Sequence, residues 1–143
     1  MSKIDHFRGE HSWLSNFTPC LIELDGFTYA SAEHAYQSCK SEDLEWKEFC
    51  ANPINSAGQC KRKARKIRIL RNWEMIKQEK MLLILEQKFG KEPFRTLLLE
   101  TGDSEIIEGN NHGDVYWGVS FDTGKGQNKL GIIIMNIRES YGK

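Results

Sequence analysis

Residues 20–40 read CLIELDGFTYASAEHAYQSCK, and this stretch holds the strongest structural signals of the chain. Apolar and polar residues alternate around Asp25-Gly26, a dipeptide typical of two-residue hairpin turns. Ser31 follows, and serine is among the residues most often found as the N-cap of a helix. The stretch therefore predicts two short antiparallel strands that lead directly into a helix, with Glu33 in its first turn.

This predicted helix carries a polar stripe beside its apolar face. At about 100° per residue, Glu33, Gln37 and Lys40 fall within roughly 60° of arc. The adjoining apolar face consists of Ala32, Ala35, Tyr36 and Cys39. Either Glu33 and Lys40 form an ion pair at the edge of a core, or they line a pocket as catalytic groups. In a pocket, burial would lower the pKa of Lys40 and leave a nucleophilic amine, while Glu33 is placed for proton transfer.

The remaining segments predict a single α+β domain over residues 1–143, mainly helical, with a small antiparallel sheet. Further helices are expected at 41–51, from about 55 into the basic segment, at 72–89, at 94–100, and at 130–140 with Asn128 as its cap. Residues 104–109 and 115–121 are expected to be short strands or extended segments. In the longest helix the spacing favours one buried face, made of Met75, Ile76, Leu82, Leu83, Leu85 and Phe89.

Composition restricts the class of protein. A chain of 143 residues with 28% charged residues and zero net charge is typical of a globular domain, and gives no general reason to bind membranes or nucleic acids. No segment approaches the roughly 20 apolar residues of a membrane span. The four cysteines form no C-x-x-C pair and the four histidines are scattered, so neither a metal nor a cofactor is expected. A reduced, cytoplasmic protein is the simplest interpretation.

Positive charge is concentrated in one segment, KRKARKIRILR, which runs from Lys61 to Arg71 and has seven basic residues and no acidic one. This segment is either a solvated helix face or a local anion site. Trp73 follows it, at the start of the longest predicted helix. An indole beside cations suits a nucleobase that carries a phosphate, because the base stacks on the ring while the cations bind the phosphate.

Two glycine-containing motifs near the C-terminus are weaker signals. In GDVYWG, Trp117 lies near Asp114 and between glycines that permit close approach of a ligand, although a structural turn is an equally good interpretation. GKGQNKLG (residues 124–131) leads into a helix, so its N–H groups are candidates for binding a phosphate or ribose oxygen. It fits neither the Rossmann nor the P-loop pattern.

In this order the segments resemble the NADAR family (NAD- and ADP-ribose-associated, also called YbiA-like). The resemblance rests on WLSNFTPC, LDGFTYASAEHAYQSCK, INSAGQCKRKARKI, LRNWE, KQEKMLLILEQKF, TGDSEIIEGN, GDVYWGV and GKGQNKLGIIIMNIR, which cover nearly all of residues 7–138. The combination of S-x-E-H-A-Y-Q-x-x-K with W-G…G-x-N-x-L-G is specific, and it implies a YbiA-like α+β fold.

The resemblance implies an N-glycosidase, a hydrolase that cleaves the bond between C1 of a phosphorylated ribose or ADP-ribose and a base or amine. Known substrates of the family include phosphoribosylamino-pyrimidines of riboflavin biosynthesis and ADP-ribosylated guanine. The expected partner is a phosphoribosyl or ADP-ribosyl small molecule, or an ADP-ribosylated nucleic acid. The alternatives are a non-catalytic ADP-ribose- or nucleotide-binding module and a nucleic-acid-binding protein that uses Lys61–Arg71.

The functional positions of the family correspond here to Glu33, Trp73 and Asp114, and Lys40 matches a lysine implicated in covalent catalysis. Glu33, Lys40 and Asp114 are therefore the predicted catalytic residues. Glu33 would stabilise charge at C1 or move protons, Lys40 would attack C1 unless water does so, and Asp114 would bind ribose hydroxyls or orient the nucleophile. Trp73 is predicted to hold the base. The further predicted substrate-binding residues are Asn16, Gln37, Arg65, Trp117, Gly118 and Asn128.

Overall fold

The computed structural model describes residues 2–142, which divide into two compact units. The central unit comprises residues 16–88, and the terminal unit comprises residues 2–15 together with residues 89–142. Helices dominate both units and the strands are short, so the predicted α+β class is confirmed.

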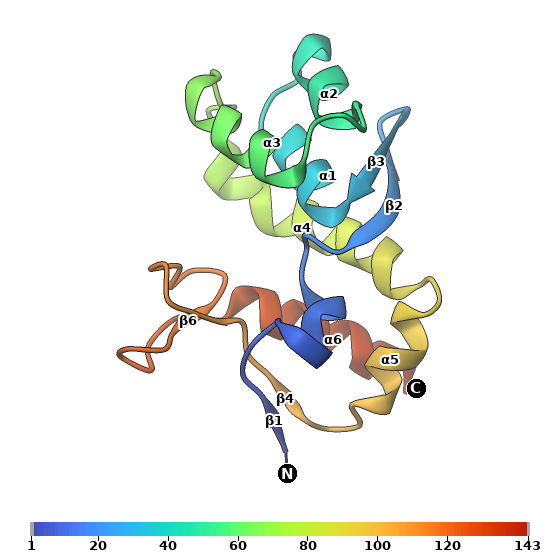
Figure 1. Ribbon diagram of the computed structural model, residues 1–143, viewed down its shortest axis with the longest axis vertical. Coiled ribbons are helices and arrows are strands. Elements are labelled where there is room, and N and C mark those ends of the chain that lie inside the picture. Colours follow the sequence, from blue (N-terminus) through green and yellow to red (C-terminus); the bar gives the residue numbers. More distant parts are fainter. Residues whose placement is uncertain (1, 143) are drawn as a thin grey trace. The chain divides into compact units, whose positions relative to one another are not determined.

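The central unit begins with the predicted hairpin, formed by β2 (Pro19–Leu24) and β3 (Phe27–Ser31) in antiparallel register. Asp25 and Gly26 connect the strands with φ angles of 52° and 84°. Positive φ at both central residues is what a type I′ turn requires, and Asp-Gly adopts it readily. Figure 1 shows this hairpin beside α1 (Ala32–Ser38), which begins directly after β3.

Local capping determines where the helices of the central unit begin. Ser31 Oγ accepts a hydrogen bond from His34 N at the start of α1, as predicted. Asp43 caps α2 (Leu44–Ala51), which ends before Asn52-Pro53, and Ser56 forms a reciprocal capping box with Gln59 at the start of α3 (Ala57–Lys63). The helical path continues as a short 3₁₀ turn, η2 (Ala64–Lys66), and α4 (Trp73–Phe89) follows after an irregular segment.

One predicted boundary differs from the structure, because α1 ends at Ser38 and Lys40 lies in the turn that follows. The backbone N–H groups of Cys39 and Lys40 donate to Tyr36 O and Gln37 O, which tightens the chain into this turn. Lys40 O in turn accepts a hydrogen bond from Leu70 N (2.9 Å), which ties the turn to the segment before α4.

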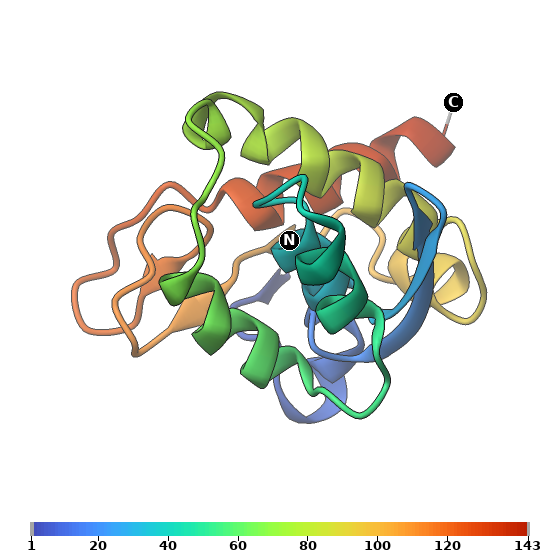
Figure 2. The same ribbon diagram turned by 90° about the horizontal axis from the view of Figure 1, so that it is seen from above.

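The predicted buried face of α4 is partly wrong. Met75 is 85% exposed, and Leu82 and Leu83 are also exposed. Figure 2 shows α4, the long yellow-green helix, from a second direction. The residues of this helix that are buried are Trp73, Met81, Ile84, Leu85, Lys88 and Phe89. The run MLLIL at residues 81–85 points apolar side chains in every direction around the helix, so spacing alone does not select the face that packs.

The terminal unit contains β1 (Lys3–Ile4), the 3₁₀ helix η1 (Gly9–Leu14), α5 (Phe94–Glu100), β4 (Glu105–Ile106), β5 (Gly109–Asn110), β6 (Val119–Ser120) and α6 (Lys129–Tyr141). Here β1 pairs with β4 and β5 pairs with β6, both in parallel. The strands expected at 104–109 and 115–121 are therefore much shorter than predicted, and two parallel pairs accompany the expected antiparallel hairpin. Among residues 2–142, no helix has the length and apolar composition needed to cross a membrane.

Asn128 occupies the N-cap position of α6, but its side chain does not cap the helix as predicted. Its Oδ1 accepts from Glu108 N (3.0 Å) and its Nδ2 donates to Ile106 O (2.9 Å). The backbone of Asn128 has a φ of 52°, a left-handed conformation that asparagine tolerates better than most residues. Asn128 therefore links the start of α6 to the backbone near β4.

Candidate active site

Helix α1 brings Glu33 and Gln37 together, as the stripe predicted. Gln37 Nε2 donates a hydrogen bond to Glu33 Oε2 at 2.6 Å, across one turn of the helix. Both side chains are buried, with exposed fractions of 7% for Glu33 and 2% for Gln37. The backbone of Gln37 is also fixed, because its carbonyl oxygen accepts from Trp46 Nε1 (2.9 Å). The carboxylate of Glu33 is therefore held in a defined orientation within a protein interior.

The amine of Lys40 lies next to two aromatic rings. Its Nζ is 5.6 Å from the ring centroid of Tyr36 and 5.9 Å from that of Trp73. The two rings contact each other, with their centroids 5.3 Å apart and their planes at 54°. Distances of this size permit a cation–π attraction that holds the amine in place. Lys40 and Trp73, which lie 33 positions apart in the sequence, are thus neighbours in the central unit.

The electrostatic surroundings favour the neutral form of Lys40. Burial lowers the pKa of its ammonium group below the usual lysine value. The Glu33 carboxylate opposes this shift, whereas the positive charges of Lys61, Lys77 and Arg65 lower the pKa further. The Glu33 carboxylate and three cations are therefore close enough to shift the pKa of Lys40. A lowered pKa of Lys40 is one feature that the catalytic interpretation of the stripe predicts, and the catalytic roles stay predictions.

Two of these cations, Lys61 and Lys77, are not among the predicted site residues. Lys61 begins the basic segment, which the sequence marked as a possible anion site only as a whole. Lys77 lies one turn after Trp73 on α4 and forms an ion pair with Glu74 (2.6 Å). Its only sequence signal is this helical spacing from Trp73, which is too weak to single it out. Arg65, a predicted phosphate ligand, lies exposed in η2.

Trp73 is more enclosed than expected for a residue that stacks on a base. Its side chain is only 6% exposed, because it packs against Tyr36 and lies next to the Lys40 amine. Asn16, another predicted site residue, lies at the start of α1. Its backbone oxygen accepts from Glu33 N (2.9 Å), and its Nδ2 donates to Met81 Sδ (3.5 Å). The central unit thus brings together Asn16, Glu33, Gln37, Lys40, Arg65 and Trp73.

A groove with a volume of about 730 Å³ lies on the central unit next to the Lys40 turn. Its lining consists of Ser41, Glu42, Asp43, Trp46, Ile67, Arg68, Ile69, Leu70 and Arg71. Two acidic residues therefore face the same groove as two arginines of the basic segment. Residues 67–71 of the basic segment therefore line a groove of mixed charge and do not form a uniformly cationic surface.

Asp114 belongs to a turn of the terminal unit that is organised by hydrogen bonds. Its Oδ1 accepts from Tyr116 N (3.1 Å) and from Trp117 N (2.9 Å). The buried side chain of Asn110 binds both Asp114 N (3.1 Å) and Asp114 O (2.9 Å). Asp114 therefore acts structurally on the backbone of GDVYWG, and its predicted catalytic role stays a prediction.

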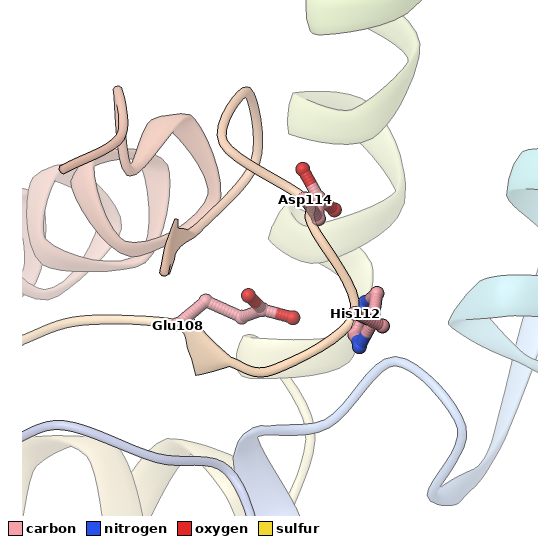
Figure 3. Close-up of side chains that lie close together, drawn as sticks. All are labelled: Glu108, His112 and Asp114. Atoms are coloured by element: carbon pink, nitrogen blue, oxygen red, sulfur yellow. The ribbon is translucent and has the colours of Figure 1, made fainter. Parts of the chain in front are cut away.

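Figure 3 shows Glu108, His112 and Asp114 close together on this segment. One potential ligand atom from each lies within 4.8 Å of the others, so this group could hold a divalent cation. Glu108 Oε2 accepts from Asn110 Nδ2 (2.9 Å), while His112 is exposed. Hydrogen bonding within the loop accounts for much of this arrangement, and the sequence had not indicated a metal site here.

The structure does not support anion binding by GKGQNKLG. The N–H groups of Gln127, Asn128, Lys129 and Leu130 donate to the backbone oxygens of residues 115–118. They are therefore engaged within the terminal unit, and the expectation that they present free donors to a phosphate is wrong. Gly118 has a packing role, because a Cβ at this position would lie 1.9 Å from Glu108 Oε2. Trp117 contacts Tyr116 edge to face, at 4.9 Å.

A buried carboxylate beside an amine of lowered pKa defines a site suited to acid–base or nucleophilic chemistry. Comparison with known proteins then gives the family. The chain belongs to the NADAR family, because the NADAR domain matches residues 5–141. The predicted family is therefore confirmed.

Two relatives illustrate the similarity. A riboflavin biosynthesis protein of Vibrio vulnificus is 37% identical over 132 residues, which cover 90% of this chain and 35% of that protein. The N-glycosidase YbiA of Escherichia coli K12 is 33% identical over 129 residues, which cover 87% of this chain and 78% of YbiA. The chain thus spans about a third of the Vibrio protein and most of YbiA.

A solved structure supports the fold. The NMR structure of E. coli YbiA matches with a TM-score of 0.86 and 30% sequence identity, over 99% of this chain and 85% of YbiA. The predicted YbiA-like α+β fold is therefore confirmed. The name of the E. coli relative also agrees with the enzyme class predicted from the sequence, an N-glycosidase.

Proposed function

We propose that this protein is an N-glycosidase that hydrolyses the bond between C1 of a phosphorylated ribose and the nitrogen of a base or base-like amine. The observation that carries the proposal is the position of Lys40, whose amine lies next to two aromatic rings and close enough to Glu33 and three cations for their charges to shift its pKa. The names of the relatives, which include N-glycosidases and a riboflavin biosynthesis protein, support the same reaction.

The carboxylate of Glu33 is the group that would stabilise the positive charge created by this reaction. Breaking a ribosyl C1–N bond produces an oxocarbenium-like transition state with positive charge at C1. A carboxylate held next to C1 stabilises that charge, and the bond from Gln37 fixes its orientation before the substrate arrives. Glu33 also transfers protons, either from an attacking water or to the departing nitrogen.

Lys40 adds a covalent route to direct attack by water. Its neutral amine attacks C1, and the C1–N bond breaks while the departing nitrogen takes the electron pair and a proton. The sugar ring then opens to an imine between Lys40 and C1, with a proton moving to the ring oxygen. Water adds to the imine carbon and releases the free sugar, which restores the amine. The lowered pKa of Lys40 favours this route, because only the neutral amine is a nucleophile.

The cations around Lys40 support a phosphate on the substrate. Lys61, Arg65 and Lys77 contribute three positive charges around the Lys40 amine, and phosphate oxygens are strong acceptors for lysine and arginine. The substrate candidates are a phosphoribosylamino-pyrimidine and an ADP-ribosylated guanine, as a small molecule or within a nucleic acid. Because Trp73 is largely enclosed, its proposed part is to flank the Lys40 amine at the site.

We also place the enzyme in the cytoplasm, since its four cysteines are buried and form no disulfide among residues 2–142. A test of the reaction is incubation of the protein with both candidate substrates, followed by mass spectrometry of the released base. Release of the base from at least one substrate is expected. Binding of ADP-ribose by calorimetry without any base release would instead support the non-catalytic binding module.

A further inference from the structure

Two residues that hydrogen-bond to Glu33 each carry a side-chain carbonyl oxygen without a hydrogen-bond partner among residues 2–142. The two oxygens are Oδ1 of Asn16 and Oε1 of Gln37. Both side chains are more than nine-tenths buried, with exposed fractions of 7% and 2%. Buried polar atoms in proteins nearly always find a partner, so unpartnered ones next to a candidate catalytic carboxylate indicate the place of a ligand.

The neighbouring contacts show why oxygens, and not amide nitrogens, are left without a partner. Gln37 Nε2 donates to Glu33 Oε2, and turning the amide around would place an oxygen against the carboxylate. Asn16 Nδ2 faces Met81 Sδ, and a thioether accepts hydrogen bonds but does not donate them. The atoms that remain for a ligand are therefore two hydrogen-bond acceptors.

Both acceptors belong to residues that hydrogen-bond to Glu33 through other atoms. Gln37 bonds the Glu33 side chain directly, and Asn16 O accepts from Glu33 N (2.9 Å) at the start of α1. A ligand atom that binds Gln37 Oε1 therefore lies near the Glu33 carboxylate, and the Asn16 side chain belongs to a residue that contacts the Glu33 backbone. In a riboside that is cleaved at C1, the donors of the sugar nearest to C1 are the hydroxyl groups on C2 and C3.

The chemistry of the acceptors disfavours a phosphate at this position, because the oxygens of an ionised phosphate are acceptors themselves. Hydroxyl groups can donate, and the cations Lys61, Arg65 and Lys77 are available for the phosphate. We propose that Asn16 Oδ1 and Gln37 Oε1 form a subsite for the ribose hydroxyls and make the protein selective for ribose over 2-deoxyribose. This inference rests on the proposed function, since it assumes a substrate that presents its sugar to Glu33.

The closing experiment measures binding of ribose 5-phosphate and 2-deoxyribose 5-phosphate to the full chain by calorimetry. The wild-type protein should bind the ribose compound at least about tenfold more tightly, because the 2-deoxy compound leaves a buried acceptor unpaired. Equal affinities would overturn the inference, and so would a failure of ribose 5-phosphate to bind at millimolar concentration.

Two apolar substitutions of similar size test the residues themselves. Asn16→Leu and Gln37→Met should each bring the affinity ratio of the two sugars close to one. Asn136→Leu is the matched control, because Asn136 is exposed on α6, and it should keep the wild-type ratio. A wild-type ratio in both site variants, with the fold verified by circular dichroism, would show that other groups, or buried waters, satisfy these oxygens.

Failure of this inference can be told apart from failure of the proposed function. A protein that releases the base equally fast from a riboside and from its 2-deoxy analogue is an N-glycosidase without the proposed subsite. A protein that binds ribose 5-phosphate selectively but releases no base has the subsite without the activity.

Discussion

Gln37 Nε2 lies 2.6 Å from Glu33 Oε2, one turn further along α1, and this bond joins two buried side chains. It occupies one side of the Glu33 carboxylate and leaves the rest of the group for chemistry. The polar stripe of α1 is therefore a pre-oriented carboxylate with its supporting amide. The amine of Lys40 follows in the next turn of the chain.

Trapping with borohydride tests the covalent route. Reduction during turnover should attach the sugar to Lys40, because the imine is converted to a stable amine, and peptide mass spectrometry should locate the adduct. Lys40→Arg keeps the positive charge but cannot form the imine, so it should give no adduct and little activity. Turnover without any adduct in the wild-type protein would favour direct attack by water.

The lowered pKa of Lys40 gives the covalent route a characteristic pH dependence. The fraction of neutral amine rises with pH and reaches its maximum at a lower pH than for an ordinary lysine. The rate of adduct formation should therefore rise with pH and level off below the usual lysine pKa of about 10.4. A profile that still rises steeply above that pH would mean that Lys40 titrates as an exposed lysine.

The cations around Lys40 should act on the phosphate of the substrate. Lys61→Ala and Arg65→Ala should each raise the KM for a phosphorylated riboside by about tenfold, the effect of losing one charge-assisted hydrogen bond. The KM for the unphosphorylated riboside should change much less. Lys66→Ala is the control, because Lys66 is the exposed neighbour of Arg65 and is not among the charges that shift the pKa of Lys40.

Because of the lowered pKa of Lys88, the free energy of unfolding should depend on pH. Burial lowers the pKa of this lysine to about 8, partly offset by Cys20, and its side chain is fully enclosed. Between pH 8 and the unfolded pKa of about 10.4, the unfolded chain binds more protons than the folded one at this residue. The contribution of Lys88 to the free energy of unfolding therefore rises with pH across this window, by up to about 3 kcal/mol.

Urea unfolding at several pH values between 7.5 and 10 measures this effect. The wild-type protein should gain stability with pH relative to Lys88→Met, which removes the titrating group but keeps an apolar stem of similar length. Identical pH profiles for the two proteins would show that Lys88 is protonated in the folded state across this range.

Local signals explain which parts of the fold were predictable. Asp25-Gly26 and Ser31 determine the conformation of their immediate neighbours, and the hairpin and the start of α1 follow from them. The buried face of α4 depends on contacts with distant segments, and the apolar run at residues 81–85 does not reveal which side is covered. The shortness of β4 to β6 likewise depends on tertiary pairing.

The site was predictable to a similar extent. Helical spacing placed Glu33, Gln37 and Lys40 together, although Lys40 lies just beyond the helix. Spacing did not show that Gln37 donates to Glu33, nor that Lys77 of α4 is close enough to lower the pKa of Lys40. The function itself came from the family resemblance, because a stripe of polar residues is compatible with a simple ion pair.

The most direct test of the central claim uses the Glu33→Gln variant with a phosphoribosylated base as the substrate. Mass spectrometry measures the rate at which the variant releases the base. The variant should fold normally and lose about 10²–10⁴-fold in rate, because glutamine keeps the shape of the side chain but neither carries the charge nor transfers the proton. Glu79→Gln, an exposed change on α4, should keep the wild-type rate. Full activity in a correctly folded Glu33→Gln variant would contradict the assignment of Glu33 and the mechanism built on it.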